Sequence, residues 1–303
     1  MQLGFIGLGN MGGRVARRLL AAGYPLGVYS RHSDSTRALV DLGAQTFASP
    51  RLLASHCDVV LTMVPDDDAV EGVVLGADGV LAGMREGGTI IDLSSVHPST
   101  SRSIAAAVAL RRAFFLDAPV SGSTPQAEAG TLLVFVGGDR DIYERCRPIF
   151  ECVSSASFFM GGSGTGATMK LVVNELLGVG MQALAEALTL GEHAGLDKDV
   201  LIDVLQQTSV LTPGQKAKLQ NARNDTYPIQ FALRLMWKDF GNVMRLAQEH
   251  SVPLPATAAA HQISAIAHTR GPDEDFSAVI RTMEELAGLP LAPQRRQPAD
   301  RAA

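Results

Sequence analysis

The sequence predicts an α/β domain with a mostly parallel, doubly wound sheet, followed by an all-α domain that a long helix joins to it. Short apolar segments alternate with helical patterns through the first half of the chain, which is typical of βαβ units. The second half contains only helical patterns. Between them, the run from Thr165 to His193 contains no proline and would reach about 40 Å as a helix.

These patterns divide the chain into three parts. We assign residues 1–163 to the α/β domain and residues 164–289 to the helical domain. The helical domain is expected to contain further helices near residues 197–207, 213–223, 230–250, 255–268 and 275–288. The last part, residues 290–303, is rich in proline and alanine and is predicted to be a disordered tail.

Composition narrows the function classes. The 303 residues are 46% hydrophobic and 19% charged, which is typical of a globular protein with an ample core. A net charge of -5 favours no nucleic-acid partner. The seven histidines lack metal-ligand spacing, so no metal is expected. The three cysteines form no CxxC pair and indicate a reducing compartment, so we expect a cytoplasmic protein.

The long run is apolar on nearly all sides, which favours burial and raises the alternative of a membrane span. We expect no membrane partner, because polar residues interrupt the run at Lys170, Asn174, Glu175, Gln182 and Glu186. A helical domain of this size is expected to cover part of such a helix with a second subunit. We therefore predict a homodimer or a homotetramer.

The first strand ends in a glycine motif of the form GxGxxG. A strand precedes the motif and a helix follows it, which is the context of a Rossmann-type dinucleotide site. The first glycine would make the tight turn, the second would admit the pyrophosphate and the third would let the helix pack on the strand. The candidate cofactor-binding residues here are Gly7, Leu8, Gly9, Asn10, Met11 and Gly12.

Further strands are predicted at residues 25–30, 45–48, 58–64, 87–94 and 113–120, with helices between them from 33–42 and from Pro50, Asp68 and Pro98. Ligands of such sheets bind beyond the carboxyl ends of the strands. The second strand ends at Ser30, Arg31 and Ser33, where NAD-binding proteins have an acidic residue. An arginine between serines suits a 2′-phosphate, so we expect NADP rather than NAD.

Two other stretches are candidates for substrate chemistry. Ser121, Gly122 and Ser123 follow a strand and could bind a carboxylate through backbone N–H groups and hydroxyls. Lys170 and Asn174 are four residues apart and share one face of the long helix. A cation and an amide at the start of a buried helix suggest a functional role, although a surface lysine and a structural asparagine would fit the pattern too.

Four motifs, in order, resemble the β-hydroxyacid dehydrogenase family, which includes 3-hydroxyisobutyrate dehydrogenase, tartronate semialdehyde reductase and glyoxylate/succinic semialdehyde reductase. They are GFIGLGNMG, DAPVSGS with AEAGTL, GGSGTGATMKLVVNE and WKDFGNV. The resemblance extends from residue 2 to about residue 288. Imine reductases are similar but replace the lysine that this chain keeps, and 6-phosphogluconate dehydrogenases are much longer.

The resemblance implies roles for particular residues. It makes Lys170 the catalytic acid/base, Asn174 the residue that orients the substrate, and the Ser121–Gly122 turn the carboxylate site. It also places four residues along the cofactor: Val64, Pro65, Ser95 and Lys238. Many members have glycine at position 123, and some have asparagine at position 69, so this chain departs from them at Ser123 and Ala69.

The expected activity is the NADP-dependent interconversion of a small, carboxylate-bearing 3-hydroxy acid and its semialdehyde or oxo acid. A glyoxylate/succinic semialdehyde reductase and an imine reductase-like enzyme are alternatives. A non-catalytic NADP-binding scaffold belongs to a different class, and loss of Lys170 or Asn174 would indicate it. Both residues are present.

Overall fold

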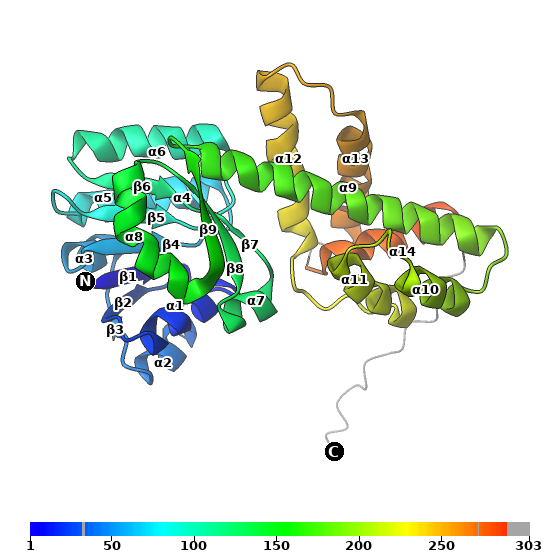
Figure 1. Cartoon of the computed structure of the whole chain (residues 1–303), viewed down its shortest axis with the longest axis horizontal. Helices are drawn as coiled ribbons and strands as arrows, with labels where there is room; N and C mark the ends of the chain where they lie inside the picture. The colour runs from blue at the N-terminus through cyan, green and yellow to red at the C-terminus, as the bar shows by residue number, and fades with distance from the viewer. Residues whose placement is uncertain (32–33, 272, 290–303) are drawn as a thin grey trace. The chain divides into compact units, whose positions relative to one another are not determined.

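A computed structural model describes residues 1–31, 34–271 and 273–289 (Figure 1). Tertiary contacts divide the chain into two units, Met1–Val173 and Asn174–Ala303. The division falls inside helix α9, whereas the sequence analysis placed it just before this helix. The predicted tail lies outside the described residues.

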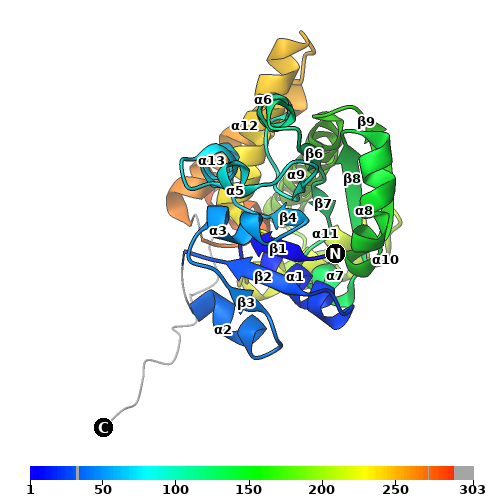
Figure 2. The same ribbon diagram turned by 90° about the vertical axis from the view of Figure 1, so that its left-hand side faces the viewer.

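The first unit is built on a mixed sheet that is mostly parallel. Its strands, in the part of the chain that the structure describes, are β1 (Leu3–Ile6), β2 (Leu26–Tyr29), β3 (Gln45–Thr46), β4 (Val59–Thr62), β5 (Thr89–Asp92), β6 (Phe114–Asp117), β7 (Val120–Ser121), β8 (Leu132–Gly137) and β9 (Ser154–Gly161). They lie in the order β3-β2-β1-β4-β5-β6-β8-β7, and β9 pairs with β8. Strands β1 to β6 run parallel, as do β8 and β9, while β8 is antiparallel to β6 and β7. Figure 2 shows the part of this sheet that contains β3, β2, β1 and β4.

Helices cover both faces of the sheet, as the doubly wound prediction requires. They are α1 (Gly12–Ala21), α2 (Asp34–Val40), α3 (Pro50–Ser55), α4 (Asp67–Leu75), α5 (Val80–Gly83), α6 (Pro98–Leu110), α7 (Thr124–Ala129) and α8 (Arg140–Val153). Neighbouring strand residues face opposite cores: Phe5 packs in one with α1 and α8, and Ile6 in the other with α3, α4 and α6. Because both faces are buried, strands β1, β2, β4, β5 and β6 are largely apolar. The predicted fold is confirmed.

The first unit also contains elements that were not predicted, namely α5, α7, β8, α8 and β9, and one predicted strand is divided. The strand predicted at 113–120 is interrupted at Pro119, so β6 pairs with β5 while β7 pairs with β8. Proline has no N–H to donate to a ladder, and the chain changes its pairing partner there. Helix α8 was not predicted, and it contains Pro148, which sequence patterns treat as a helix breaker.

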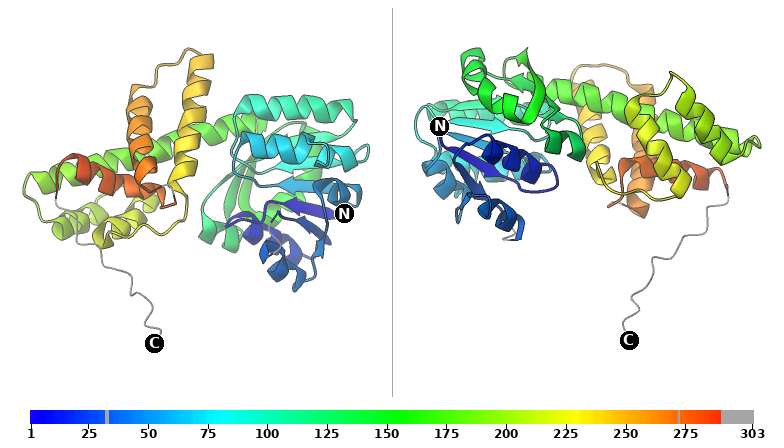
Figure 3. Two further views of the ribbon diagram at one scale, coloured as in Figure 1. Left: turned by 180° about the vertical axis from the view of Figure 1, so that it is seen from behind. Right: turned by 60° about the horizontal axis from the view of Figure 1, so that its bottom comes forward.

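All regular elements in the described part of the second unit are helices. Beyond α9 (Thr165–His193) its elements are α10 (Lys198–Gln207), α11 (Pro213–Asn224), α12 (Leu233–Glu249), α13 (Pro255–Arg270), the 3-10 turn η1 (Phe276–Ala278) and α14 (Val279–Leu286). Each predicted helix is found within a few residues of its expected position. Helices α12 and α13, gold and orange in Figure 3, run side by side.

Helix α9 is long and apolar enough to cross a membrane by length and composition alone. The core helix of a soluble protein can pass the same test, so one such helix is weak evidence for a membrane span. Within the second unit its residues Met181, Leu184 and Leu188 are buried in one core with Phe240 of α12. A Cβ added at Gly178 would lie 2.3 Å from the Phe240 ring, so the two helices are in close contact. These contacts favour the core-helix interpretation.

Candidate functional site

The predicted site residues divide between the two units. The cofactor candidates of the sheet, the Ser121–Gly122–Ser123 turn and Lys170 belong to the first unit. Asn174 and Lys238 belong to the second. Lys170 and Asn174 are nevertheless one turn apart on the continuous helix α9.

The glycine motif forms a tight loop between β1 and α1. Gly7 has a φ of 99°, a left-handed conformation that favours glycine, and a Cβ there would lie 2.1 Å from the carbonyl oxygen of Met63. A Cβ at Gly12 would lie 1.9 Å from the carbonyl oxygen of Gly7. A Cβ at Gly9 would meet nothing within 4 Å. The loop is therefore closed against the protein at its ends and open at Gly9.

The start of α1 is suited to an anion. Its N-cap residue, Met11, makes no side-chain cap hydrogen bond, and the first turn holds no acidic residue. N–H groups at such a helix start favour phosphate. Leu8 is buried at the same loop, and Asn10 is exposed.

The neighbouring strand end carries the predicted 2′-phosphate residues. Strands β1 and β2 are parallel, with Ile6 opposite Tyr29, so both loops leave the sheet at one edge. Arg31 follows β2 and is exposed, and Ser30 is half-buried. Ser33 lies outside the described residues.

A buried carboxylate organises the next two strand ends. The backbone N–H of Val64 donates to Ser94 Oγ at 2.9 Å, and Ser94 Oγ donates to Asp92 Oδ1 at 2.6 Å. Thr62 Oγ1 also donates to this oxygen, at 2.7 Å. Burial raises the pKa of Asp92 above its ordinary value, and hydrogen bonds from Ser94 and Thr62 oppose that rise. This network positions the chain at Val64, next to the exposed Pro65; Ser95 follows Ser94 and is half-buried.

The turn after β7 contains a glycine in a left-handed backbone conformation. Gly122 has a φ of 130° and is exposed, and Ser121 is half-buried. Ser123 is the N-cap of α7: both its N–H, at 3.0 Å, and its hydroxyl, at 2.9 Å, donate to Gln126 Oε1. In this conformation the polar hydrogens of Ser123 are used within the protein, whereas its predicted role in substrate binding stays a prediction.

Helix α9, which carries Lys170, begins against a second buried carboxylate. Asp117 Oδ1 accepts from the N–H of Gly164 at 2.7 Å, and Oδ2 accepts from the N–H of Ala167 at 2.9 Å. Burial raises the pKa of Asp117 to about 6, against the lowering effect of these two hydrogen bonds. Lys170 itself is half-buried.

In the second unit, Asn174 belongs to a buried polar group with α12. Its Nδ2 donates to Asp239 Oδ2 at 2.5 Å, and Asp239 Oδ1 lies 3.0 Å from Nζ of Lys238. Asn174 and Asp239 are each 1% exposed. Asn174 Oδ1 is buried and has no hydrogen-bond partner among the described residues. It is thus an available acceptor in the core of the unit.

Two family models cover nearly all of this chain. The NAD-binding domain of 6-phosphogluconate dehydrogenase matches residues 2–162, more than half of the sequence. The NAD-binding domain of NADP-dependent 3-hydroxyisobutyrate dehydrogenase matches residues 164–283. The chain belongs to the β-hydroxyacid dehydrogenase family.

Relatives within this family have related activities. Glyoxylate/succinic semialdehyde reductase 2 of Arabidopsis thaliana is 35% identical over 94% of this chain and 80% of its own length. The 2-(hydroxymethyl)glutarate dehydrogenase of Eubacterium barkeri is 35% identical over 96% of this chain and 98% of its own. A crystal structure of 3-hydroxyisobutyrate dehydrogenase from Salmonella typhimurium is 30% identical, with a TM-score of 0.85 over 93% of this chain and 99% of its own.

This β-hydroxyacid dehydrogenase is therefore an NAD(P)-dependent dehydrogenase that acts on CH–OH groups. The residues present fit a dinucleotide, since the loop is open at Gly9 and the first turn of α1 lacks both a side-chain cap and an acidic residue. The described residues contain no cluster of His, Cys, Asp and Glu that could hold a metal ion.

Three carboxylates of the structure were not among the predicted site residues of this β-hydroxyacid dehydrogenase. Asp92 and Asp117 occupy the last positions of adjacent strands, which is a signal that the sequence offered. Asp239 lies next to Lys238 and reads as half of a surface ion pair, so its burial could not be anticipated. The capping box of Ser123 and Gln126 follows a recognisable S-x-x-Q spacing.

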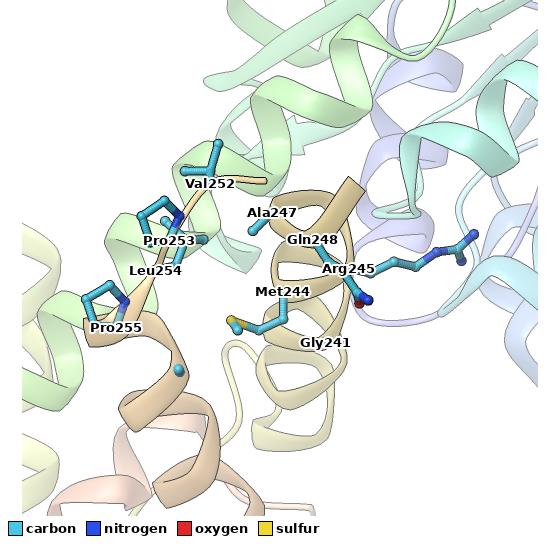
Figure 4. Close-up of a pocket in the computed structure, with 10 residues that line it drawn as sticks. Gly241, Met244, Arg245, Ala247, Gln248, Val252, Pro253, Leu254 and Pro255 are labelled. Atoms are coloured by element: carbon cyan, nitrogen blue, oxygen red, sulfur yellow. The ribbon is translucent and has the colours of Figure 1, made fainter. Parts of the chain in front are cut away.

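A pocket of about 790 Å³ in the second unit contains none of these residues (Figure 4). It lies between α12 and α13, and its wall is largely apolar. The lining residues are Gly241, Met244, Arg245, Ala247, Gln248, Val252, Pro253, Leu254, Pro255 and Ala258. The lining of the pocket thus includes neither Lys170 nor Asn174, and most of its side chains are apolar.

Proposed function

We propose that the protein interconverts a small 3-hydroxy acid and its semialdehyde or oxo acid, using NADP, with Lys170 as general acid/base. The observation that carries this proposal is the pairing of Lys170 and Asn174 on α9, whose first turn is held by Asp117. Asp117 precedes the Ser121–Gly122 turn on the same chain segment. A proton carrier and a carboxylate site therefore share one structural support.

NADP is favoured over NAD by the chemistry at the end of β2. Arg31 is exposed there, and no acidic side chain occupies the position that holds the ribose of NAD. A guanidinium can form paired hydrogen bonds with a 2′-phosphate. The family model of the second unit is described by an NADP-dependent enzyme, which supports the same choice.

NADP, when bound, would supply the hydride chemistry at the hydroxyl-bearing or carbonyl carbon of the substrate. The glycine loop and the start of α1 would hold the phosphates, with Val64, Pro65, Ser95 and Lys238 along the cofactor. In oxidation, neutral Nζ of Lys170 would accept the hydroxyl proton of the substrate. In reduction, the protonated amine would return a proton to the carbonyl oxygen.

The other residues would position the substrate. The backbone N–H groups of Ser121 and Gly122 would bind its carboxylate, and the exposure of Gly122 supports this role. Asn174 donates to Asp239, which orients the amide so that Oδ1 can accept a hydrogen bond from the substrate.

Reduction of glyoxylate or succinic semialdehyde is the second candidate. Ser123 resembles the reductases of that name, although Thr124, Pro125 and Gln126 do not, and one such reductase is 35% identical to this chain. An imine reductase-like activity is less well supported, because Lys170 is present. Steady-state rates with a panel of 3-hydroxy acids and small aldehydes, each with NADP(H) and NAD(H), would separate these activities.

Replacement of Lys170 tests the mechanism. Lys170→Ala should lower kcat by a factor of about 10² to 10⁴ while the cofactor still binds, because the phosphates are held elsewhere. Lys216→Ala on α11 is the matched control, since it is also a half-buried lysine on a helix. Wild-type kcat in Lys170→Ala would contradict the mechanism, and no turnover of any panel member by the wild type would favour the NADP-binding scaffold.

We also propose that the protein is a cytoplasmic homodimer or homotetramer. Leu176 and Leu190 of α9 are 72% and 71% exposed in the single chain, although both are large and apolar. Exposed leucines on a central helix favour cover by a second subunit.

A further inference from the structure

The N-terminus of α9 is capped by a residue far from it in sequence. The residue before the helix is Gly164, which has no side chain to offer, and Asp117 accepts hydrogen bonds from the N–H groups of Gly164 and Ala167 instead. The first N–H groups of any helix lack intrahelical acceptors, and a carboxylate also suits the positive end of the helix dipole. The contact bridges 47 and 50 positions of sequence.

Close packing fixes the position of the first turn of α9 relative to Asp117. A Cβ at Gly166 would lie 2.4 Å from the carbonyl oxygen of Phe135 and 2.5 Å from that of Asp117. The first turn of α9 therefore rests directly on the backbone of β6 and β8. Asp117 is 1% exposed, so no water competes freely for its oxygens.

We propose that Asp117 is a positioning residue, which sets the place of Lys170 relative to the Ser121–Gly122 turn. Lys170 lies three residues beyond Ala167 on α9, in the turn that directly follows the one Asp117 anchors. Ser121 lies four residues beyond Asp117 at the end of β7. The Asp117 side chain thus connects Lys170 with the turn that is proposed to bind the carboxylate of the substrate. This inference rests on the proposed role of Lys170.

The adjacent carboxylate gives a matched comparison. Asp92 lies directly opposite Asp117 in the parallel pair of β5 and β6 and is equally buried. Its partners are Thr62 and Ser94, and Ser94 binds the N–H of Val64 on the predicted cofactor side. Loss of Asp92 should therefore affect the cofactor, whereas loss of Asp117 should affect the chemical step.

The ionisation of Asp117 should make the anchoring of α9 depend on pH. The Asp117 carboxyl faces the N–H groups at the start of α9, Gly137 of β8 and the carboxyl of Asp92 on β5. The nearby Asp92 carboxyl adds to the effect of burial and raises the pKa of Asp117 further. With a pKa of about 6, Asp117 is ionised at neutral pH and accepts both bonds. Protonation below that pH turns one acceptor into a donor, so the anchoring of α9 should weaken in acid.

The experiment compares Asp117→Asn with Asp92→Asn in the full chain. We expect Asp117→Asn to lower kcat by about 10- to 100-fold, because small displacements of a catalytic group have effects of this size, with little change in the dissociation constant of NADPH. We expect Asp92→Asn to weaken NADPH binding more than it lowers kcat. In a Lys170→Ala background, Asp117→Asn should lower kcat no further, since the residue acts through Lys170.

Equal effects of the two asparagine variants, or a full further loss in the Lys170→Ala background, would overturn the inference. If Asp117→Asn does not fold, the wild type decides in the direction of reduction, where Lys170 acts as an acid and stays protonated at low pH: kcat at saturating cofactor should fall below about pH 6 as the anchoring of α9 weakens, and a flat profile there contradicts the role. Unchanged kcat in Lys170→Ala refutes the proposed function itself. Loss of kcat in Lys170→Ala but not in Asp117→Asn refutes only the positioning role.

Discussion

The hydrogen bond between Asn174 and Asp239 can be tested by its contribution to stability. In Asn174→Ala, Asp239 loses a 2.5 Å donor but keeps Lys238, whose Nζ lies 3.0 Å from Oδ1. Hydrogen bonds to charged groups contribute about 1.5–3 kcal/mol. Because one partner of Asp239 remains, we expect the free energy of unfolding to fall by about 2 kcal/mol.

Fluorescence can report on the second unit alone. Trp237, the single tryptophan of the chain, lies on α12 two residues before Asp239. Urea unfolding followed by Trp237 fluorescence should therefore give a lower midpoint for Asn174→Ala with an unchanged slope.

The matched control is Asn221→Ala. Asn221 is a half-buried asparagine of the same unit whose Nδ2 donates to the neutral hydroxyl of Ser277 at 3.1 Å. Its loss should cost about 0.5–1.5 kcal/mol. If Asn174→Ala is no more destabilising than this control, the contact with Asp239 does not act as a charge-assisted hydrogen bond.

Three further outcomes are expected. Arg31→Ala should raise the KM for NADP far more than the KM for NAD, and the lost contact should correspond to about 1.5–3 kcal/mol in kcat/KM for NADP. Equal effects on both cofactors would remove the basis for NADP preference. Asp275→Ala should destabilise the second unit by about 3–5 kcal/mol in the same urea assay, because it leaves Lys218, whose side chain is 9% exposed, without its carboxylate; a loss below 1 kcal/mol would contradict this. Light scattering at micromolar concentration should give the mass of a dimer or tetramer, and a monomer mass would contradict the predicted oligomer.

The sequence determined those features that depend on local patterns. The glycine motif between a strand and a helix, the alternation of strands and helices from β1 to β6 and the span of α9 from Thr165 to His193 were predicted as the structure has them. Each depends on neighbouring residues, through the twofold or 3.6-fold repeat of apolar side chains and through glycine and proline. Helix α8, which contains Pro148, was not predicted.

Only the tertiary structure decided how distant polar residues meet. Asp117 binds the start of α9 across 50 positions, and Asn174 meets Asp239 across 65. Neither contact is marked in the sequence, because an aspartate at a strand end or on a helix has the same local pattern whether it is exposed or buried. Burial depends on which elements pack together, and burial is what makes an acceptor scarce and raises the pKa of Asp117. The sequence therefore proposes candidate residues such as Lys170 and Asn174, whereas the carboxylates that anchor them required the fold.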